Sequence, residues 1–315
     1  MKNTCQKITS FVIMAGLTLG LSGCVTINLG SAPTAIVNET PTQLPDLEEI
    51  PTTLPQSPGL TEAALLNGRY LSPLLQQPIQ LVEGTYEGMV EGVELNARVQ
   101  PGIQFGDLNA DGISDAAFLL AEDTGGSGVF VSLVVIYSRG EYFQQAQGIL
   151  IDDRPVINAI SIENGVVKIT GLVHGPNDPM VDPTTSMSVE FTLFGDQMVR
   201  TWQKSAFEGS AEHLIVIESP FDGEEVFGSF TLKGFMPIGP FENNLALTIL
   251  DKSNAELVRE GFMVEAVNMG APAIFDNLIE LPAVQPGTEL LVILSELSMA
   301  DGSPIAIDAV RVIVK

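Results

Sequence analysis

From about residue 61 to residue 205, short apolar runs alternate with turns rich in Gly, Asn and Asp. Four of these runs are rich in β-branched residues, which favour strands: 128–138, 155–162, 165–173 and 186–194. Asn164 and Gly165 separate the second run from the third, and Asn-Gly favours a tight hairpin because both residues tolerate positive φ. The pattern predicts a β-rich domain over 61–205, with a short helix over 61–67.

A second β-rich unit is predicted over 213–315. Its first half alternates apolar runs and turns as strand, turn, strand, strand, turn, strand, and two more strands follow after residue 287. Turn signals at intervals of about 8–12 residues are typical of a β-sandwich. Residues 203–212 are predicted to be a short linker, and no repeat of fixed period indicates a propeller or a solenoid. The fold class is therefore mainly β, with a β-rich N-terminal domain followed by a β-sandwich.

The N-terminal 23 residues are typical of a secretory signal peptide. Lys2 and Lys7 precede an uncharged, mostly apolar stretch from Phe11 to Leu21. This stretch is too short to span a bilayer, which takes about 20 residues. It ends in Leu21-Ser22-Gly23-Cys24, which resembles the bacterial lipobox. The resemblance implies cleavage before Cys24 and acylation of its thiol; the alternative is an ordinary signal peptide with a chance cysteine.

The cysteine count agrees with a lipid anchor. The chain has 2 cysteines, and Cys5 would leave with the signal peptide. A mature chain that keeps only Cys24 can form no internal disulfide, and it has no other thiol for catalysis or a zinc cluster. Residues 24–60 are rich in Pro and Thr, so we expect a semi-extended tether behind the lipid. The expected location is the cell membrane or outer envelope, facing away from the cytoplasm.

The charge balance excludes some partners. The chain has 39 acidic and 14 basic residues, for a formal net charge of −25. Nucleic-acid binding requires clustered Lys and Arg against phosphates, and anionic lipid binding requires a polybasic patch. Neither fits this composition. We therefore expect contact with the membrane through the lipid alone, and a protein or cell-wall partner.

The last hundred residues resemble the immunoglobulin-like domain of bacterial spore germination. The matching segments are Ser219-Pro220, 226–234, Phe241-Glu242 leading into 244–251, Phe275 and 295–314. The resemblance covers nearly all of 213–315. It implies an immunoglobulin-like β-sandwich without catalytic residues, and it does not establish a role in sporulation.

Residues 105–195 are similar to an uncharacterised domain that often precedes such a module. The matching segments are 105–120, 124–128, 160–167 and 174–180. Many relatives have two cysteines directly after the last segment, where this chain has Val181-Asp182. This difference argues against a disulfide or metal role for that segment here.

The sequence FGDLNADGISDAAFLL, residues 105–120, contains the strongest candidate site. Positions 1, 3, 5 and 9 of a nine-residue loop are polar, Gly112 permits a sharp turn, and the Ile113 carbonyl is free to contribute; the four polar residues are Asp107, Asn109, Asp111 and Asp115. Calcium takes six to eight oxygen ligands from such flexible loops. An EF-hand needs glutamate at position 12, where this chain has Phe118. The loop instead resembles the acidic loops of integrin-type FG-GAP blades.

Three interpretations of this loop remain open. Crowded carboxylates repel one another without a cation, which favours a structural Ca²⁺ bound by Asp107, Asn109, Asp111, Ile113 and Asp115. A polar turn closed by Asx hydrogen bonds needs no metal. A catalytic role is the third, although paired glycosidase carboxylates usually come from separated elements.

No convincing catalytic constellation accompanies the loop. His174 and His213 are the only histidines and are expected to be structural, since no G-x-S-x-G elbow supplies a nucleophile. The glycine-rich segment at 122–128 lacks the Gly-Lys-Ser/Thr ending of a phosphate loop. Asp152-Asp153 before Arg154 predicts a turn with a local ion pair. Trp202 is expected to pack between the two domains rather than to bind sugar.

The sequence therefore predicts an envelope-anchored lipoprotein with a non-catalytic binding or scaffolding role. The alternative is a hydrolase of cell-envelope polymers with the acidic loop in its active site. The acidic loop is the feature that both hypotheses share, and the missing second polar cluster favours the first.

Replacing Cys24 tests the anchor. We expect Cys24→Ala to abolish acylation and to leave an uncleaved precursor or a misplaced protein, because the thiol that carries the lipid is gone. Cys5→Ala should leave acylation unchanged, since Cys5 leaves with the signal peptide. Mass spectrometry of the N-terminal peptide measures both; a wild-type Cys24 without an acyl mass would show that the lipobox interpretation is wrong.

Overall fold

The computed structural model describes residues 59–140, 142–176 and 178–315. The predicted signal peptide, Cys24 and the tether as far as residue 58 lie outside these residues. The described chain is mainly β, as the sequence predicts. One α-helix and one 3-10 turn accompany the strands: α1 (Glu62–Leu66) and η1 (Phe241–Asn243). Thr61 caps α1 by accepting a hydrogen bond from the Ala64 backbone. In this part of the chain no helix is long and apolar enough to cross a membrane.

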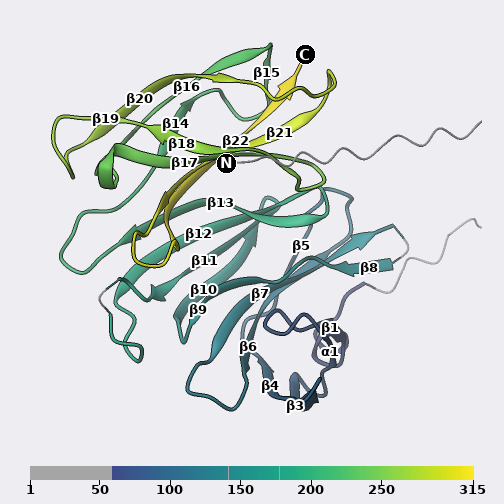
Figure 1. Cartoon of the computed structure of the whole chain (residues 1–315). Helices are drawn as coiled ribbons and strands as arrows, with labels where there is room; N and C mark the ends of the chain where they lie inside the picture. Colours follow the sequence, from purple (N-terminus) through teal and green to yellow (C-terminus); the bar gives the residue numbers. More distant parts are fainter. Residues whose placement is uncertain (1–58, 141, 177) are drawn as a thin grey trace, which may run out of the picture. The chain divides into compact units, whose positions relative to one another are not determined.

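The first large sheet has seven strands. They are β3 (Thr85–Val90), β4 (Val93–Val99), β5 (Gln104–Gly106), β6 (Asp115–Asp123), β7 (Phe130–Arg139), β8 (Tyr142–Gln145) and β9 (Ile149–Asp153). The main path is β3-β4-β6-β7-β8, while β5 pairs with β6 and β9 pairs with β7 (Figure 1). A small hairpin of β1 (Arg69–Leu71) and β2 (Pro78–Gln80) precedes it.

Strand β6 is buried on both faces, which explains its almost unbroken apolar sequence. Phe118 and Leu120 point into a core shared with Leu65 of α1 and Tyr70 of β1. Leu119 and its neighbours of the same parity point into the opposite core, against strands of the next sheet. The alternation follows from the two-residue period of a strand. The acidic loop is thus attached directly to the most deeply buried strand of this half.

The second sheet has nine strands. They are β10 (Val156–Glu163), β11 (Val166–Val173), β12 (Thr185–Phe194), β13 (Gln197–Ala206), β15 (Glu224–Val226), β17 (Asn244–Asp251), β18 (Glu256–Met263), β21 (Glu289–Leu297) and β22 (Pro304–Val314). The path is β10-β11-β12-β13-β22-β21-β17-β18, and β15 pairs with β22 in parallel. The strands predicted near 128–138, 155–162, 165–173 and 186–194 are β7, β10, β11 and β12.

The predicted hairpin at Asn164 and Gly165 joins β10 to β11. Both residues have positive φ, 52° and 78°. These values suit the tight two-residue turns that follow the twist of the flanking strands.

The third sheet completes a β-sandwich in the C-terminal half. It contains β14 (Val216–Ser219), β16 (Ser229–Met236), β19 (Glu265–Ala266) and β20 (Ala273–Glu280), in the order β14-β16-β20-β19. Its inner face packs on β17, β18, β21 and β22, with Leu232, Leu247, Phe275 and Val292 at the centre of the shared core. Phe262 and Phe275 meet edge to face, with ring centroids 5.5 Å apart.

The two halves share one sheet, because β13 pairs with β22. The register joins Trp202 to Asp308 and Gln203 to Ile307. The Gln203 side chain is buried, and its amide donates to the Pro304 carbonyl at 2.6 Å. Residues 203–206, predicted as part of a linker, belong to strand β13, which runs to Ala206. Only the segment after Ala206 connects the two halves outside a strand.

An apolar cluster packs beside the β13–β22 pairing. Phe194, at the end of β12, packs with Leu291 and Ile293 of β21 and with Ile307 of β22. The β12–β13 turn passes so close to the β17–β18 turn that a methyl group on Gly195 would overlap the carbonyl oxygen of Lys252. Gly195 also has a φ of +60°, which side chains disfavour. A glycine is therefore required where the two halves meet.

Gly195→Ala tests this contact. We expect a loss of about 2–4 kcal/mol of unfolding free energy, because the methyl group meets the Lys252 carbonyl in addition to the strained φ. Gly92→Ala is the matched control, since Gly92 has a φ of +87° and an added methyl group there would meet no atom within 4 Å. Its cost should be about 1 kcal/mol. Chemical denaturation of both variants measures the difference; equal losses would show that the turn can move aside.

Candidate functional site

The acidic loop connects β5 to β6, and its side chains hydrogen-bond its own backbone. Asp107 accepts from the amides of Asp111 at 3.2 Å and Gly112 at 2.9 Å. Asp111 accepts from the Ile113 amide at 2.8 Å. Gly112 has a φ of +82° and supplies the sharp turn that the sequence predicts. These are the Asx contacts of a polar turn.

Asp115 is the first residue of β6 and is buried, unlike the exposed residues at the tip of the loop. Its carboxylate is fully buried and accepts two backbone hydrogen bonds of 2.7 Å, from Leu108 and from Ser138 of β7. Burial raises the pKa of Asp115, and the charges of Asp111 and Asp107 act in the same direction, while the two backbone hydrogen bonds oppose them. Asp115 therefore fastens the loop to β7.

Asp111 reaches the same strand from above. The Ser138 hydroxyl donates to Asp111, and the Asn109 amide donates to the Ser138 carbonyl at 2.8 Å. Burial alone would raise the pKa of Asp111, but hydrogen bonds from Ser138, Ile113 and Asn109 lower it further than burial raises it, so the net shift is downward. Both Asp111 and Asn109 are thus held by protein partners.

These partners bear on the predicted calcium site. Within the described ranges, no three His, Cys, Asp or Glu side chains are grouped to hold a metal ion. Asp107, Asn109 and Asp111 share the loop as expected, and each Asp115 oxygen accepts one backbone hydrogen bond. The contact of Ile113 with Asp111 is through its amide, whereas the predicted ligand is its carbonyl. Calcium binding at these residues stays a prediction, tested below.

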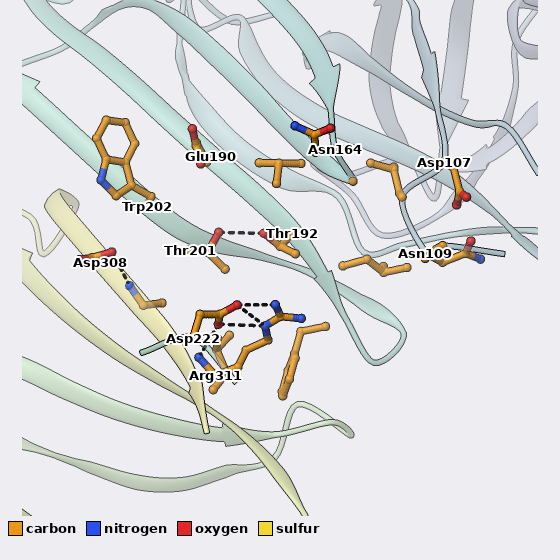
Figure 2. A pocket seen from close by; sticks show the side chains of 18 residues that line it. Asp107, Asn109, Asn164, Glu190, Thr192, Thr201, Trp202, Asp222, Asp308 and Arg311 are labelled. Carbon is orange, nitrogen blue, oxygen red and sulfur yellow. Dashed lines mark hydrogen bonds and ion pairs between the residues drawn. The ribbon is translucent and has the colours of Figure 1, made fainter. Parts of the chain in front are cut away.

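Beside the loop lies an open cleft of about 740 Å³ (Figure 2). One wall carries Asp107 and Asn109 of the acidic loop and Asn164 of the β10–β11 turn. The floor comes from β12 and β13, and the opposite wall comes from β21, β22 and Asp222. Clefts of this size, with an aromatic side chain and a few convergent polar groups, are the usual form of a ligand site. The cleft is therefore the strongest candidate site in the described residues.

Four residues form a row across the sheet, and three of them, Glu190, Trp202 and Asp308, line this cleft. Lys168 of β11 pairs with Glu190 of β12, Glu190 pairs with Trp202 of β13, and Trp202 pairs with Asp308 of β22. Directly opposed residues on neighbouring strands have Cβ atoms about 5 Å apart. The order across the sheet is therefore cation, acid, aromatic ring, acid. Figure 2 shows Trp202 with Glu190 and Asp308 nearby.

A β-bulge sets the direction of Trp202. The register steps from Glu190 opposite Trp202 to Phe191 opposite Arg200, so Thr201 has no partner of its own. Bulges bend a strand and redirect a side chain. Here Thr201 and Trp202 both line the cleft, and the Thr201 hydroxyl lies 3.0 Å from that of Thr192.

Asp308 is the most perturbed acid of the row. Its carboxylate accepts backbone hydrogen bonds from Ile217 at 2.7 Å and Ala309 at 3.0 Å. Burial nevertheless raises the pKa of Asp308 to about 6, and Glu190 contributes to the increase. Because the folded pKa is raised, this group stabilises the fold most fully below the ordinary aspartate pKa, and the contribution is lost as pH rises through about 6.

Among the described residues, the one basic side chain that lines the cleft is already paired. Arg311 of β22 binds both carboxylate oxygens of Asp222, with Nε 3.0 Å from Oδ1. This pairing lowers the pKa of Asp222. Asp308 has no ion-pair partner within the described part of the chain. The lining thus presents more carboxylate charge than its paired arginine can balance.

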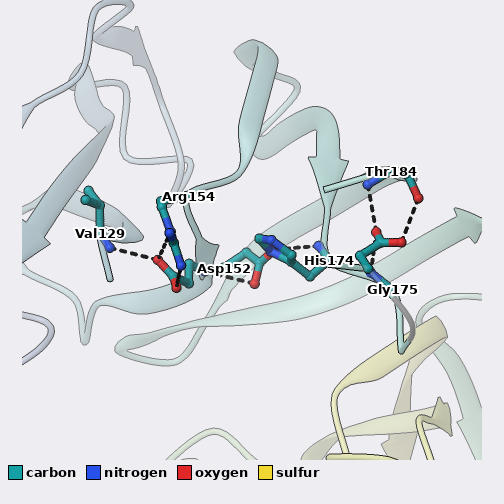
Figure 3. A network of polar contacts seen from close by, with 8 residues as sticks. Val129, Asp152, Arg154, His174, Gly175 and Thr184 are labelled. Carbon is teal, nitrogen blue, oxygen red and sulfur yellow. Dashed lines mark hydrogen bonds and ion pairs between the residues drawn. The ribbon is translucent and has the colours of Figure 1, made fainter. Parts of the chain in front are cut away.

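A second polar network surrounds His174, after the end of β11 (Figure 3). Its Nδ1 lies 2.9 Å from Asp152, while Asp153 forms the predicted ion pair with Arg154 at 2.7 Å. The Nε2 atom of His174 is buried and has no hydrogen-bond partner among the described residues. A catalytic triad needs a hydroxyl at that nitrogen. His174 is held in place through its Nδ1 contact with Asp152.

His213 is likewise tied to its surroundings. Its Nδ1 lies 3.0 Å from the buried Glu296 of β21, and its ring meets Phe207 edge to face. Its backbone pairs with Ser205 of β13. His213 therefore fastens the connection after β13 to the sandwich.

The structure keeps the predicted residues together in the loop, but only two of them reach the cleft. Asp107 and Asn109 line the cleft, whereas Asp111, Ile113 and Asp115 do not. Trp202 lies at the junction of the halves, as expected, but it also faces the cleft. Sequence reasoning missed Glu190 and Asp308, because they become neighbours only through β13–β22 pairing. The one available signal was the single tryptophan, which lies in a predicted β-rich region that also contains the acid-rich loop.

Calcium titration tests the acidic loop. If Asp107, Asn109, Asp111, Ile113 and Asp115 bind Ca²⁺, the melting temperature should rise with calcium and fall with a chelator. Binding to the native state alone stabilises it by about 2.7 kcal/mol at a hundredfold excess over Kd. Magnesium should act more weakly because it demands stricter octahedral geometry.

The control for this titration is Asp111→Ala, which should remove the calcium response and leave the rest of the melting transition in place. Differential scanning calorimetry measures both proteins. A wild-type transition that responds neither to millimolar calcium nor to chelator would leave the loop as an Asx-bonded turn.

Comparison with known proteins adds one result. No curated protein and no solved structure is significantly similar to the chain. Residues 214–303 match the family model described as the immunoglobulin-like domain of bacterial spore germination. The match ends just before β22, the strand that both completes the sandwich and pairs with β13. Residues 214–303 thus form an immunoglobulin-like domain.

Proposed function

We propose that the protein is a lipid-anchored envelope protein that binds a protein or cell-wall partner in the cleft, in a non-catalytic or scaffolding role. The observation that carries the proposal is the cleft itself. Its polar walls, its partly exposed Trp202 and its volume suit recognition of an extended ligand. The immunoglobulin-like domain supplies one wall of it, which agrees with a binding role.

The proposed lipid anchor on Cys24 gives this cleft its context. A folded domain held near a membrane by an acylated cysteine and a proline-rich tether meets envelope components at high local concentration. The lipobox-like sequence supports this location. A binding site on such a domain would then hold its partner at the membrane surface.

A second candidate function is hydrolysis of an envelope polymer. It is favoured by Glu190 and Asp308, two carboxylates on either side of Trp202, one of which has a raised pKa. Pairs of carboxyl groups in different environments are the usual machinery of glycosidases. Both Asp308 oxygens, however, already accept backbone hydrogen bonds, which favours a positioning role over proton transfer.

Filling the cleft tests the proposed function. Thr192→Tyr places a ring on the cleft floor, so we expect the full-length variant to be released from isolated envelopes by mild detergent that leaves the wild type bound. Thr231→Tyr is the matched control, because Thr231 is an exposed strand residue of β16 outside the cleft. The bound fraction after washing is the measurement.

Two outcomes would contradict the binding role. Equal retention of Thr192→Tyr and wild type would exclude the cleft as the binding surface. Release of soluble fragments from envelope polymers by the wild type, abolished in Glu190→Gln, would establish the hydrolase instead.

A further inference from the structure

The row across the cleft is asymmetric in charge. Glu190 has a cationic neighbour, since the Lys168 ammonium lies 3.3 Å from it, while Trp202 separates it from Asp308. Asp308 has only backbone amides as hydrogen-bond partners in the described chain. Glu190 therefore has an ammonium partner in the chain, whereas Asp308 has none among the described residues.

Lys168 shows what suits this row. Its ammonium is shared between Glu190 and Glu163, each at 3.3 Å. Both carboxylates are partly or largely exposed, so the pairs are individually weak. An ammonium that arrives in the cleft would meet Glu190 from the other side, and at Asp308 it would compete with no other cation among the described residues, only with two backbone amides.

The aromatic ring supports the same ligand. A cation over the face of tryptophan is attracted by the ring quadrupole, and the attraction grows as water is excluded. Trp202 has a carboxylate on each side in the sheet, so a cation over its ring is close to two negative charges. Neither a carboxylate ligand nor a phosphate would be tolerated there.

Longer-range charge acts in the same direction. Arg311 is neutralised by Asp222, and the whole chain carries a formal net charge of −25. Such a field concentrates cations near the protein and speeds their association. The remainder of the lining, including Asn164, Thr192 and Thr201, offers neutral polar groups for peptide amides.

We propose that the cleft binds a lysine-containing peptide, with the lysine ammonium over the Trp202 ring between Glu190 and Asp308. The cleft volume of about 740 Å³ exceeds what one side chain fills, so the neighbouring peptide backbone lies along the asparagine and threonine side chains. This inference rests on the proposed function, since it names the ligand of the same cleft.

The single tryptophan makes the test specific, because all tryptophan emission comes from Trp202. The full-length chain, solubilised in non-ionic detergent, is titrated with tri-lysine. We expect saturable change of the emission and weaker binding at higher salt. Tri-lysine acetylated on its side chains keeps the shape and loses the charge, so it should bind at least about tenfold more weakly.

Four substitutions, one of them a control, separate the row from bulk charge. Glu190→Gln should weaken tri-lysine binding about tenfold, whereas Glu87→Gln, which removes the same charge from exposed β3, should leave it unchanged. Lys168→Met removes the internal competitor and should strengthen binding. Asp308→Asn should weaken binding as well; the Glu190 and Lys168 variants keep the test decisive if Asp308→Asn fails to fold.

Several outcomes would overturn the inference. They are absence of a Trp202 response to tri-lysine, equal binding of the acetylated peptide, and equal effects of Glu190→Gln and Glu87→Gln. Binding of a neutral chito-oligosaccharide in place of tri-lysine would make the cleft a glycan site. If tri-lysine binding fails but Thr192→Tyr is still released from envelopes, only the ligand class is rejected. If tri-lysine binding fails and Thr192→Tyr is retained like the wild type, the proposed function fails as well.

Discussion

The pairing of β13 with β22 makes one sheet out of strands from both halves of the described chain. Only two residue pairs carry it, Trp202 with Asp308 and Gln203 with Ile307. So short a ladder is weak by itself, and the apolar cluster around Phe194 reinforces it. Each large apolar side chain buried there contributes about 1.5–3 kcal/mol. The cleft lies where these two sets of strands meet, and residues of both line it.

The contact between the two halves also explains which strands are buried on both faces. Strand β21 packs Val292 into the sandwich core and Leu291 against Phe194 of the N-terminal half. Strand β6 divides its side chains between two cores in the same way. Each half therefore has a central apolar strand that is buried on both faces. The face of β21 that points away from the sandwich core is covered by Phe194 of the N-terminal half. The immunoglobulin-like family match covers one side of this arrangement only.

Acidic residues serve three different purposes in this chain. Asp115 and Asp107 satisfy backbone amides and fix the β5–β6 loop. Asp222 neutralises Arg311. Glu190 and Asp308 line the cleft, although Glu190 also pairs with Lys168 and Asp308 also accepts two backbone hydrogen bonds. The net charge of the sequence does not distinguish these purposes, because the difference lies in the partner that each carboxylate meets.

The sequence by itself determined the local structure wherever a short-range rule applied. The Asn164-Gly165 hairpin, the cap at Thr61 and the four apolar strands follow from turn chemistry and β-propensity within a few residues. The immunoglobulin-like domain was recognisable because its motifs recur over nearly all of residues 213–315. Strand β20 was harder to foresee, since Asp276 and Asn277 interrupt its apolar run.

Only the tertiary structure decided the site. Glu190, Trp202 and Asp308 are separated by up to about a hundred residues, and strand register alone makes them neighbours. The bulge at Thr201 then sets the direction of the ring. In the acidic loop the spacing already placed the carboxylates close together, and the structure adds the backbone amides from which they accept hydrogen bonds. Spacing within a loop specifies which groups are near one another, whereas packing decides whether they face a ligand or the protein itself.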